Sequence, residues 1–188
     1  MITTKVSKEE FFASTFIAKQ TSIVCMHPIN ISVVNNVFNA DMEQDSKIAI
    51  QYSYAVIETE IPEPGLLDVK IGLEVLIDFE DESKAKQDNS PIVKIEIQYL
   101  IRYSTPTEPI PEDIKNACLP AFSKISAVIQ CWPYLRQLVN QLTSEIGCPY
   151  MLPVIVFDPD DDDVSDHNIS PQKPSKKSEK AGKKTDSK

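Results

Sequence analysis

The chain has 188 residues, of which 25% are charged and 41% apolar; this composition suggests one domain with a hydrophobic core and excludes a fibrous or wholly disordered protein. The formal net charge is −9 at pH 7, and the basic residues cluster only near the C-terminal end, so binding to nucleic acid through phosphate neutralisation is not expected. With only four glycines, the chain also lacks the glycine-rich loops that cradle phosphate groups.

The four cysteines include no Cys-x-x-Cys pair, and this scattering is typical of reduced thiols in a protein core. No charged and then apolar leader opens the chain, and no apolar run approaches the roughly 20 residues that a bilayer crossing needs. We therefore expect a cytosolic protein that does not insert into membranes.

The first half of the chain contains one helix signal and four strand signals. Ser7-Lys8-Glu9-Glu10 has the form of a capping box and predicts a short helix, with a frayed terminus as the alternative. Residues 29–38 alternate between apolar and polar side chains with partial regularity and predict a strand. Residues 48–56, 69–79 and 93–103 alternate cleanly, which is typical of an antiparallel sheet with one face toward water.

After three closely spaced prolines the apolar period changes from 2 to about 3.6, which indicates a helical region. A short helix is expected to begin at Glu112, and Pro120 suits the first turn of a longer one. Pro133 should kink this helix without ending it, and Gly147 with Pro149 should end it. The predicted core-facing stripe consists of Phe122, Ile125, Ile129, Trp132, Leu135, Val139, Leu142 and Ile146.

The last part of the chain changes character at Asp158. Met151 to Phe157 is a short apolar segment that should be extended, whereas an aspartate run and then a Ser-, Pro- and Lys-rich end have almost nothing to bury. We therefore divide the chain into a folded domain, 1–157, and a disordered tail, 158–188. The predicted fold class is α+β, with a four-stranded antiparallel sheet followed by a long, Pro-kinked amphipathic helix.

The helix also carries a motif-level resemblance. Trp132-Pro133-Tyr134-Leu135-Arg136 matches the aromatic-Pro-Tyr-x-Arg element in the long helix of the SecB export chaperones, and Gly147, Pro149 and Pro153-Val154 follow in the family's order. The chain resembles a SecB-like chaperone over residues 22–157. It departs from the family in a shorter interval between Pro149 and Pro153, and in an aspartate run where a second helix normally follows, which favours a divergent SecB-like protein.

The resemblance implies an ATP-independent cytosolic holdase that binds non-native polypeptides without a cofactor. It also implies a homo-oligomer, either a dimer or a tetramer, and delivery of clients to the export motor SecA. Two alternatives remain open: a SecB-like chaperone dedicated to the antitoxin of a toxin–antitoxin system, and a non-chaperone oligomeric adaptor with the same fold.

Apolar residues outside the core-facing stripe indicate an interface or a client groove. A second apolar set cannot all share the face of that stripe, and one sheet has only one side to cover; its members are Leu119, Val128, Leu138 and Ile155, with Tyr134 and Tyr150. The alternative is that such residues belong to the core. The residues expected to bind clients are Trp132, Tyr134, Leu135, Leu138, Leu142, Tyr150, Leu152, Ile155 and Phe157.

Catalysis and metal binding have little support, and we expect the protein not to be an enzyme. His27 and His167 are the only histidines, and although Cys25 and His27 would share a face of a strand, both are interpreted as ordinary strand residues. The aspartate run that begins at Asp158 has the opening spacing of a calcium loop, but Asp163 stands where that loop requires glycine and Ile169 where it requires glutamate. No metal site is expected.

Overall fold

The computed structural model describes residues 1–36, 47–79, 91–106 and 111–159. Most of the predicted tail, including the part from Val164 onward that is expected to be disordered, lies outside the described residues. In chain order the elements are β1 (Ile2–Val6), α1 (Lys8–Ala18), β2 (Ser22–Asn35), β3 (Ile48–Glu60), β4 (Leu66–Phe79), β5 (Val93–Ser104), α2 (Glu112–Phe122), a π-helical turn (Ser123–Ala127), α3 (Val128–Glu145) and β6 (Ile155–Pro159).

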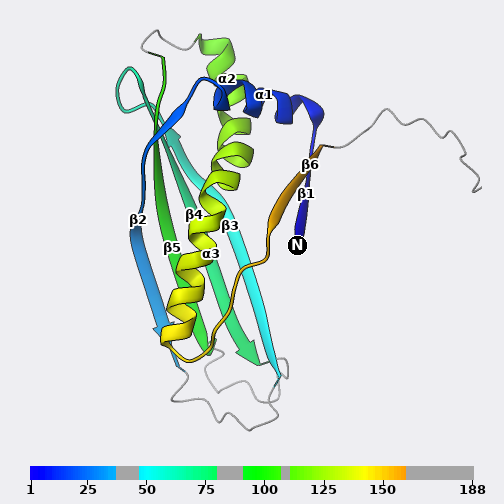
Figure 1. The fold of residues 1–188 in the computed structure, drawn as a ribbon, viewed down its shortest axis with the longest axis vertical. Coiled ribbons are helices and arrows are strands. Elements are labelled where there is room, and N and C mark those ends of the chain that lie inside the picture. The colour runs from blue at the N-terminus through cyan, green and yellow to red at the C-terminus, as the bar shows by residue number, and fades with distance from the viewer. Residues whose placement is uncertain (37–46, 80–90, 107–110, 160–188) are drawn as a thin grey trace, which may run out of the picture.

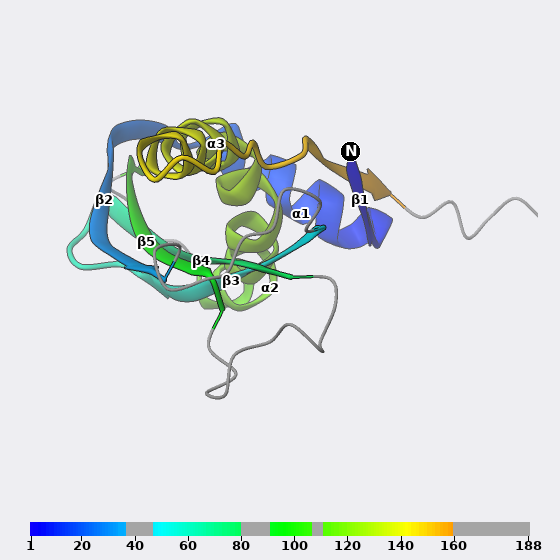
Figure 2. The same cartoon turned by 90° about the horizontal axis from the view of Figure 1, so that it is seen from below.

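The four long strands form one antiparallel sheet in the order β2-β5-β4-β3 (Figure 1), and the predicted α+β fold with a long helix is confirmed. Odd-numbered residues of β4 and β5 face the helices and are buried, as the alternation predicted. The opposite face carries ion pairs such as Lys70–Glu58 at 2.6 Å and Lys94–Glu74 at 3.1 Å. Figure 2 shows α3, β1 and β6 on the same side of the sheet.

The helical region from Glu112 to Glu145 is one continuous run rather than two helices. Pro120 lies inside α2 and does not begin a new helix, so that expectation was wrong. A proline in a helix removes one backbone hydrogen bond and crowds the preceding turn, and here the wider π-helical turn follows it directly. Pro133 lies inside α3 without ending it, and Gly147 follows the helix with a φ of +80°, as predicted for its end.

The π-helical turn changes which helix residues face the core. A π turn holds about one residue more than an α turn, and therefore rotates the following residues around the helix axis. Ile129, expected in the core, is 44% exposed, whereas Val128 beside it and Leu119 before the turn are buried. The sequence suggested two apolar faces on the helix. In the structure, Leu119 and Val128 of the second face are buried together with most of the predicted core-facing stripe.

An N-terminal unit packs beside the sheet, and its strand was not predicted. The capping box is confirmed, because the Glu10 N–H donates to Ser7 Oγ at 3.1 Å and the Ser7 N–H donates to Glu10 Oε2 at 3.2 Å. Helix α1 packs against α2 and the π-helical turn, where Ser14 Oγ lies 2.6 Å from Ser126 Oγ. Before it, β1 pairs in parallel with β6, with Ile2 opposite Ile155.

Strand β6 follows the Pro153-Val154 pair. It begins at Ile155 and continues to Pro159, two residues past the expected end of the folded domain. Its Ile155 and Phe157 side chains are buried while Val156 between them is exposed. The chain after the long helix therefore returns along the helix and joins the first strand of the protein.

Candidate polypeptide-binding surface

The Trp132–Arg136 element of α3 holds the chain segment that follows the helix. Trp132 Nε1 donates to the carbonyl oxygen of Pro153 at 2.7 Å, and Arg136 Nε donates to that of Leu152 at 2.6 Å. One helical turn beyond Val139, Thr143 Oγ1 accepts a hydrogen bond from the Tyr150 N–H at 2.9 Å. Residues 150–154 therefore run along one side of α3, with no secondary structure of their own up to Val154.

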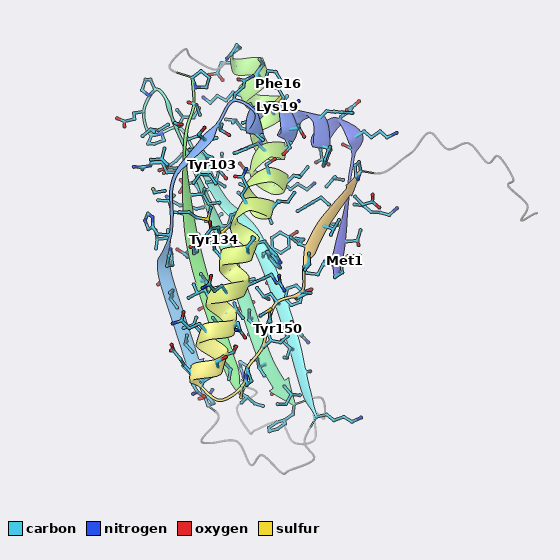
Figure 3. The ribbon with its side chains drawn as sticks, in the orientation of Figure 1. Met1, Phe16, Lys19, Tyr103, Tyr134 and Tyr150 are labelled. Atoms are coloured by element: carbon cyan, nitrogen blue, oxygen red, sulfur yellow. The ribbon has the colours of Figure 1, made fainter. Side chains whose placement is uncertain are left out.

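Four aromatic residues gather between this segment and β3, and we name them the aromatic cluster: Tyr52, Tyr54, Trp132 and Tyr150. The rings of Tyr54 and Trp132 meet edge to face, with centroids 5.3 Å apart. Burial, and to a smaller extent the neighbouring Tyr52, raises the pKa of Tyr150. Trp132 is buried and the three tyrosines are half-buried, so the cluster is accessible to solvent in part. Figure 3 shows Tyr150 beside the C-terminal half of α3.

A groove lies between β3 and α2, and we name it the edge groove. Strand β3 is the last strand of the sheet, so no described strand pairs with its outer backbone edge. A bulge between Val56 and Glu58 interrupts its pairing with β4, and Ile57 at the bulge is 52% exposed. The groove has a volume of about 580 Å³ and is lined by Val56, Ile57, Glu58, Thr59, Lys115, Asn116, Leu119, Pro120, Ser123 and Lys124.

The opposite edge of the sheet is formed by β2 and is apolar and exposed. The residues of this β2 edge are Ile23, Val24, Ile29, Ile31, Val33 and Val34. Burial is the largest cause of the raised pKa of Tyr99, and the nearby Cys131 and Tyr134 add to it. Tyr134 therefore lies on the part of α3 near β5, the neighbour of β2 in the sheet. Long, apolar, exposed edges of this kind invite pairing with another chain, although two bulges interrupt the pairing of β2 with β5, between Ile23 and Cys25 and between Pro28 and Asn30.

The nine residues predicted to bind clients do not form one surface. Tyr134 is 52% exposed on the part of α3 near β5, and Leu138, Leu142 and Tyr150 are half-buried. For the remaining residues the structure shows the alternative that the sequence left open, the core: Trp132, Leu135, Leu152, Ile155 and Phe157. In this conformation those side chains support the surface from beneath.

Sequence reasoning missed Tyr52, Tyr54 and the residues of the edge groove. The alternation in β3 did place Tyr52 and Tyr54 on the same face, and two tyrosines in a row on an inward face were the available signal. Nothing local to β3 indicated that this face would meet the segment after the long helix.

The residues considered for catalysis are not brought together. His27 is exposed and Cys25 half-buried, and the described residues contain no group of three or more His, Cys, Asp or Glu side chains that could hold a metal ion. Burial raises the pKa of the Cys131 thiol to about 12, so this thiol is protonated at neutral pH. In the described part of the chain, no helix is both long and apolar enough to cross a membrane.

Comparison with known proteins relates the chain by structure and not by sequence. No family model and no curated protein matches it. The Mycobacterium tuberculosis Rv1957 SecB-like chaperone, solved in complex with a ChAD peptide from the Rv1956 HigA1 antitoxin, superposes with a TM-score of 0.61 at 13% identity, covering 77% of this chain and 97% of that chain. A protein of unknown function from Streptococcus agalactiae gives a TM-score of 0.30 at 7% identity, covering 71% of this chain and 96% of that chain. The fold is therefore SecB-like.

Proposed function

We propose that the protein is an ATP-independent cytosolic holdase that binds extended, non-native polypeptide segments along β3. The observation that carries this proposal is the half-open aromatic cluster on the same strand as the outer edge of the sheet and its groove. An apolar client side chain buried against such a surface contributes about 1.5–3 kcal/mol, and an edge strand offers backbone hydrogen bonds that require no particular sequence. Together these features suit a binder of many unfolded chains.

Two destinations for a captured client fit this proposal. The solved neighbour holds a peptide from an antitoxin, and this favours dedication of the present chain to an antitoxin as the second candidate function. Delivery to the export motor SecA is the other destination, and it rests on the motif resemblance alone. A non-chaperone adaptor is distinguished from both by a client panel: a holdase suppresses the aggregation of several unrelated denatured proteins, a dedicated chaperone protects one, and an adaptor protects none.

The residues after α3 allow a test of the surface itself. Tyr150→Ser removes a half-buried ring of the aromatic cluster and is expected to weaken client binding by about tenfold to a hundredfold, the equivalent of one lost apolar contact, while the protein stays folded. Ile155→Asn is the contrasting variant, because it places an amide among buried apolar side chains and should destabilise the fold by several kcal/mol. Aggregation suppression and circular dichroism melting are measured on both. A folded Tyr150→Ser protein with undiminished capture would show that the aromatic cluster is not the binding surface.

We also propose that the chain forms a homo-oligomer, and that the β2 edge contributes to the contact. The long helix was first expected to supply the interface, but Leu119 and Val128 are buried within the single chain. The exposed apolar side chains include the six of the β2 edge, which lie on one strand, and Tyr134 of α3. Ile31→Lys on this edge is expected to shift the protein toward monomer in light scattering at micromolar concentration, because a charge on an edge strand opposes pairing. A wild-type protein that is already monomeric would remove the proposal.

A further inference from the structure

The backbone of the segment between α3 and β6 is held by side chains of α3 and, at its end, by the first residue of β1. Backbone carbonyls in such an irregular segment still need donors when they are buried. The carbonyls of Leu152 and Pro153 accept from Arg136 and Trp132, and the next one, that of Val154, accepts from the Ile2 N–H at 2.7 Å. Three consecutive carbonyls are therefore occupied, two of them by one motif of the helix.

The α3 side chains that hydrogen-bond to the segment share one face of the helix: Trp132 and Arg136 donate, and Thr143 accepts. Positions 132, 136 and 143 are separated by four and seven residues, and such spacings stack side chains above one another on a helix. Along this face Thr143 meets Tyr150, Arg136 meets Leu152 and Trp132 meets Pro153. The helix thus presents a row of hydrogen-bonding groups. The segment that follows runs antiparallel to the helix and bonds to these groups one after another.

This pairing sets the register of the segment. Leu152 is fully buried, whereas Met151 before it is about half exposed and Pro153 after it is half-buried. A slip of one residue along the helix would move Leu152 out of the core and put one of these two neighbours in its place. Because Arg136 bonds to the carbonyl of Leu152 and Trp132 to that of Pro153, the Leu152 side chain packs inward and the Met151 side chain points outward.

Trp132 joins this segment to β3 as well. Its indole donates to Pro153 while the ring meets Tyr54 edge to face, so one side chain links α3, the segment and the strand. Arg136 has no such ring contact and acts on the segment through the carbonyl of Leu152. From this geometry we infer that Trp132 and Arg136 are positioning residues: they clamp residues 150–154 in one register and so hold the aromatic cluster in its client-binding arrangement. That the two residues clamp residues 150–154 rests on the hydrogen bonds alone, whereas the client-binding role of the aromatic cluster rests on the proposed function.

Two variants remove the clamp donors, and the melting temperature of each reports what the smaller ring of Trp132→Phe costs in packing. Trp132→Phe keeps an aromatic ring but deletes the N–H donor, and Arg136→Met keeps the apolar stem but deletes the guanidinium. Arg136→Lys is the conservative variant, since its ammonium group can still donate a hydrogen bond. Gln137→Ala is the matched control, an exposed position beside Arg136 on the same helix.

Hydrogen exchange followed by mass spectrometry tests the clamp independently of any client. Peptides covering residues 150–157 of the Trp132→Phe and Arg136→Met proteins should exchange at least about tenfold faster than in the wild type, with β4 and β5 unchanged. Arg136→Lys should restore part of the protection, and Gln137→Ala should exchange as the wild type does. Unchanged exchange at 150–157 in both donor-deleting variants would overturn the clamp.

Affinity for a permanently unfolded probe tests the second half. Reduced and carboxymethylated lactalbumin serves as the probe, with binding measured by fluorescence anisotropy alongside the melting temperature of each variant. We expect the affinity to fall about tenfold or more in the two donor-deleting variants and to recover in part in Arg136→Lys. Faster hydrogen exchange with unchanged affinity for the probe would overturn the positioning role. A wild-type protein that does not bind the probe would overturn the proposed function, and the exchange experiment would then decide on the clamp alone.

Discussion

Leu135→Ala is expected to lower the free energy of unfolding by about 2–5 kcal/mol, the range for leucine-to-alanine changes in a packed core. Leu135 is 0% exposed and lies in the core between α3 and the sheet. The removed methyl groups leave a cavity that close-packed neighbours fill only in part. Urea unfolding followed by circular dichroism measures the change, with the slope of the transition checked against the wild type.

The adjacent residue supplies the control for this experiment. Tyr134→Ala alters the same helix by one position, but Tyr134 is half exposed, so its effect on unfolding should stay within about 0.5 kcal/mol. Equal effects at the two positions would contradict the assignment of Leu135 to the core. Both residues belong to the Trp132–Arg136 motif, and the sequence predicted that both bind clients. A large loss of stability at Leu135 alone would show that Leu135 serves the core and that Tyr134 does not.

Deletion of residues 1–20 is expected to lower the free energy of unfolding by about 3–6 kcal/mol. Val6 and Ile17 are each 2% exposed, and loss of each buried side chain costs about 1.5–3 kcal/mol. The deletion also removes the strand that pairs with β6 and the helix that packs on α2. Urea unfolding measures the loss, and binding of a hydrophobic dye reports the apolar surface that the deletion uncovers.

A second variant shows whether the effect comes from the buried face of α1. Phe12→Ser combined with Phe16→Ser changes only exposed side chains of this helix, so the stability should remain within about 1 kcal/mol of the wild type. A truncated protein as stable as the wild type would mean that the N-terminal unit does not pack on the domain. A large loss in the double variant would place the two phenylalanines in the core.

The four strands of the main sheet and the N-terminal helix were predictable because their signals are local. Alternation with period 2 in 69–79 and 93–103 depends on which side of a sheet each residue faces, and this requires no knowledge of the partner strand. The capping box at Ser7 likewise involves only residues three apart. The apolar stripe and the glycine predicted where the long helix ends, but not that the helical run from Glu112 is continuous or that it contains a π-helical turn.

The site depended on contacts between distant parts of the chain, and these were decided only in the folded molecule. Strand β1 pairs with a strand more than 150 residues later, and no pattern within either strand specifies that partner. The π-helical turn places Ile129 outward and Val128 inward. A pattern with a constant period of about 3.6 residues cannot predict this rotation. Tyr54 meets Trp132 only because β3 and α3 pack side by side. Local periodicity predicts which face of an element is apolar, but packing of the whole chain decides what that face meets.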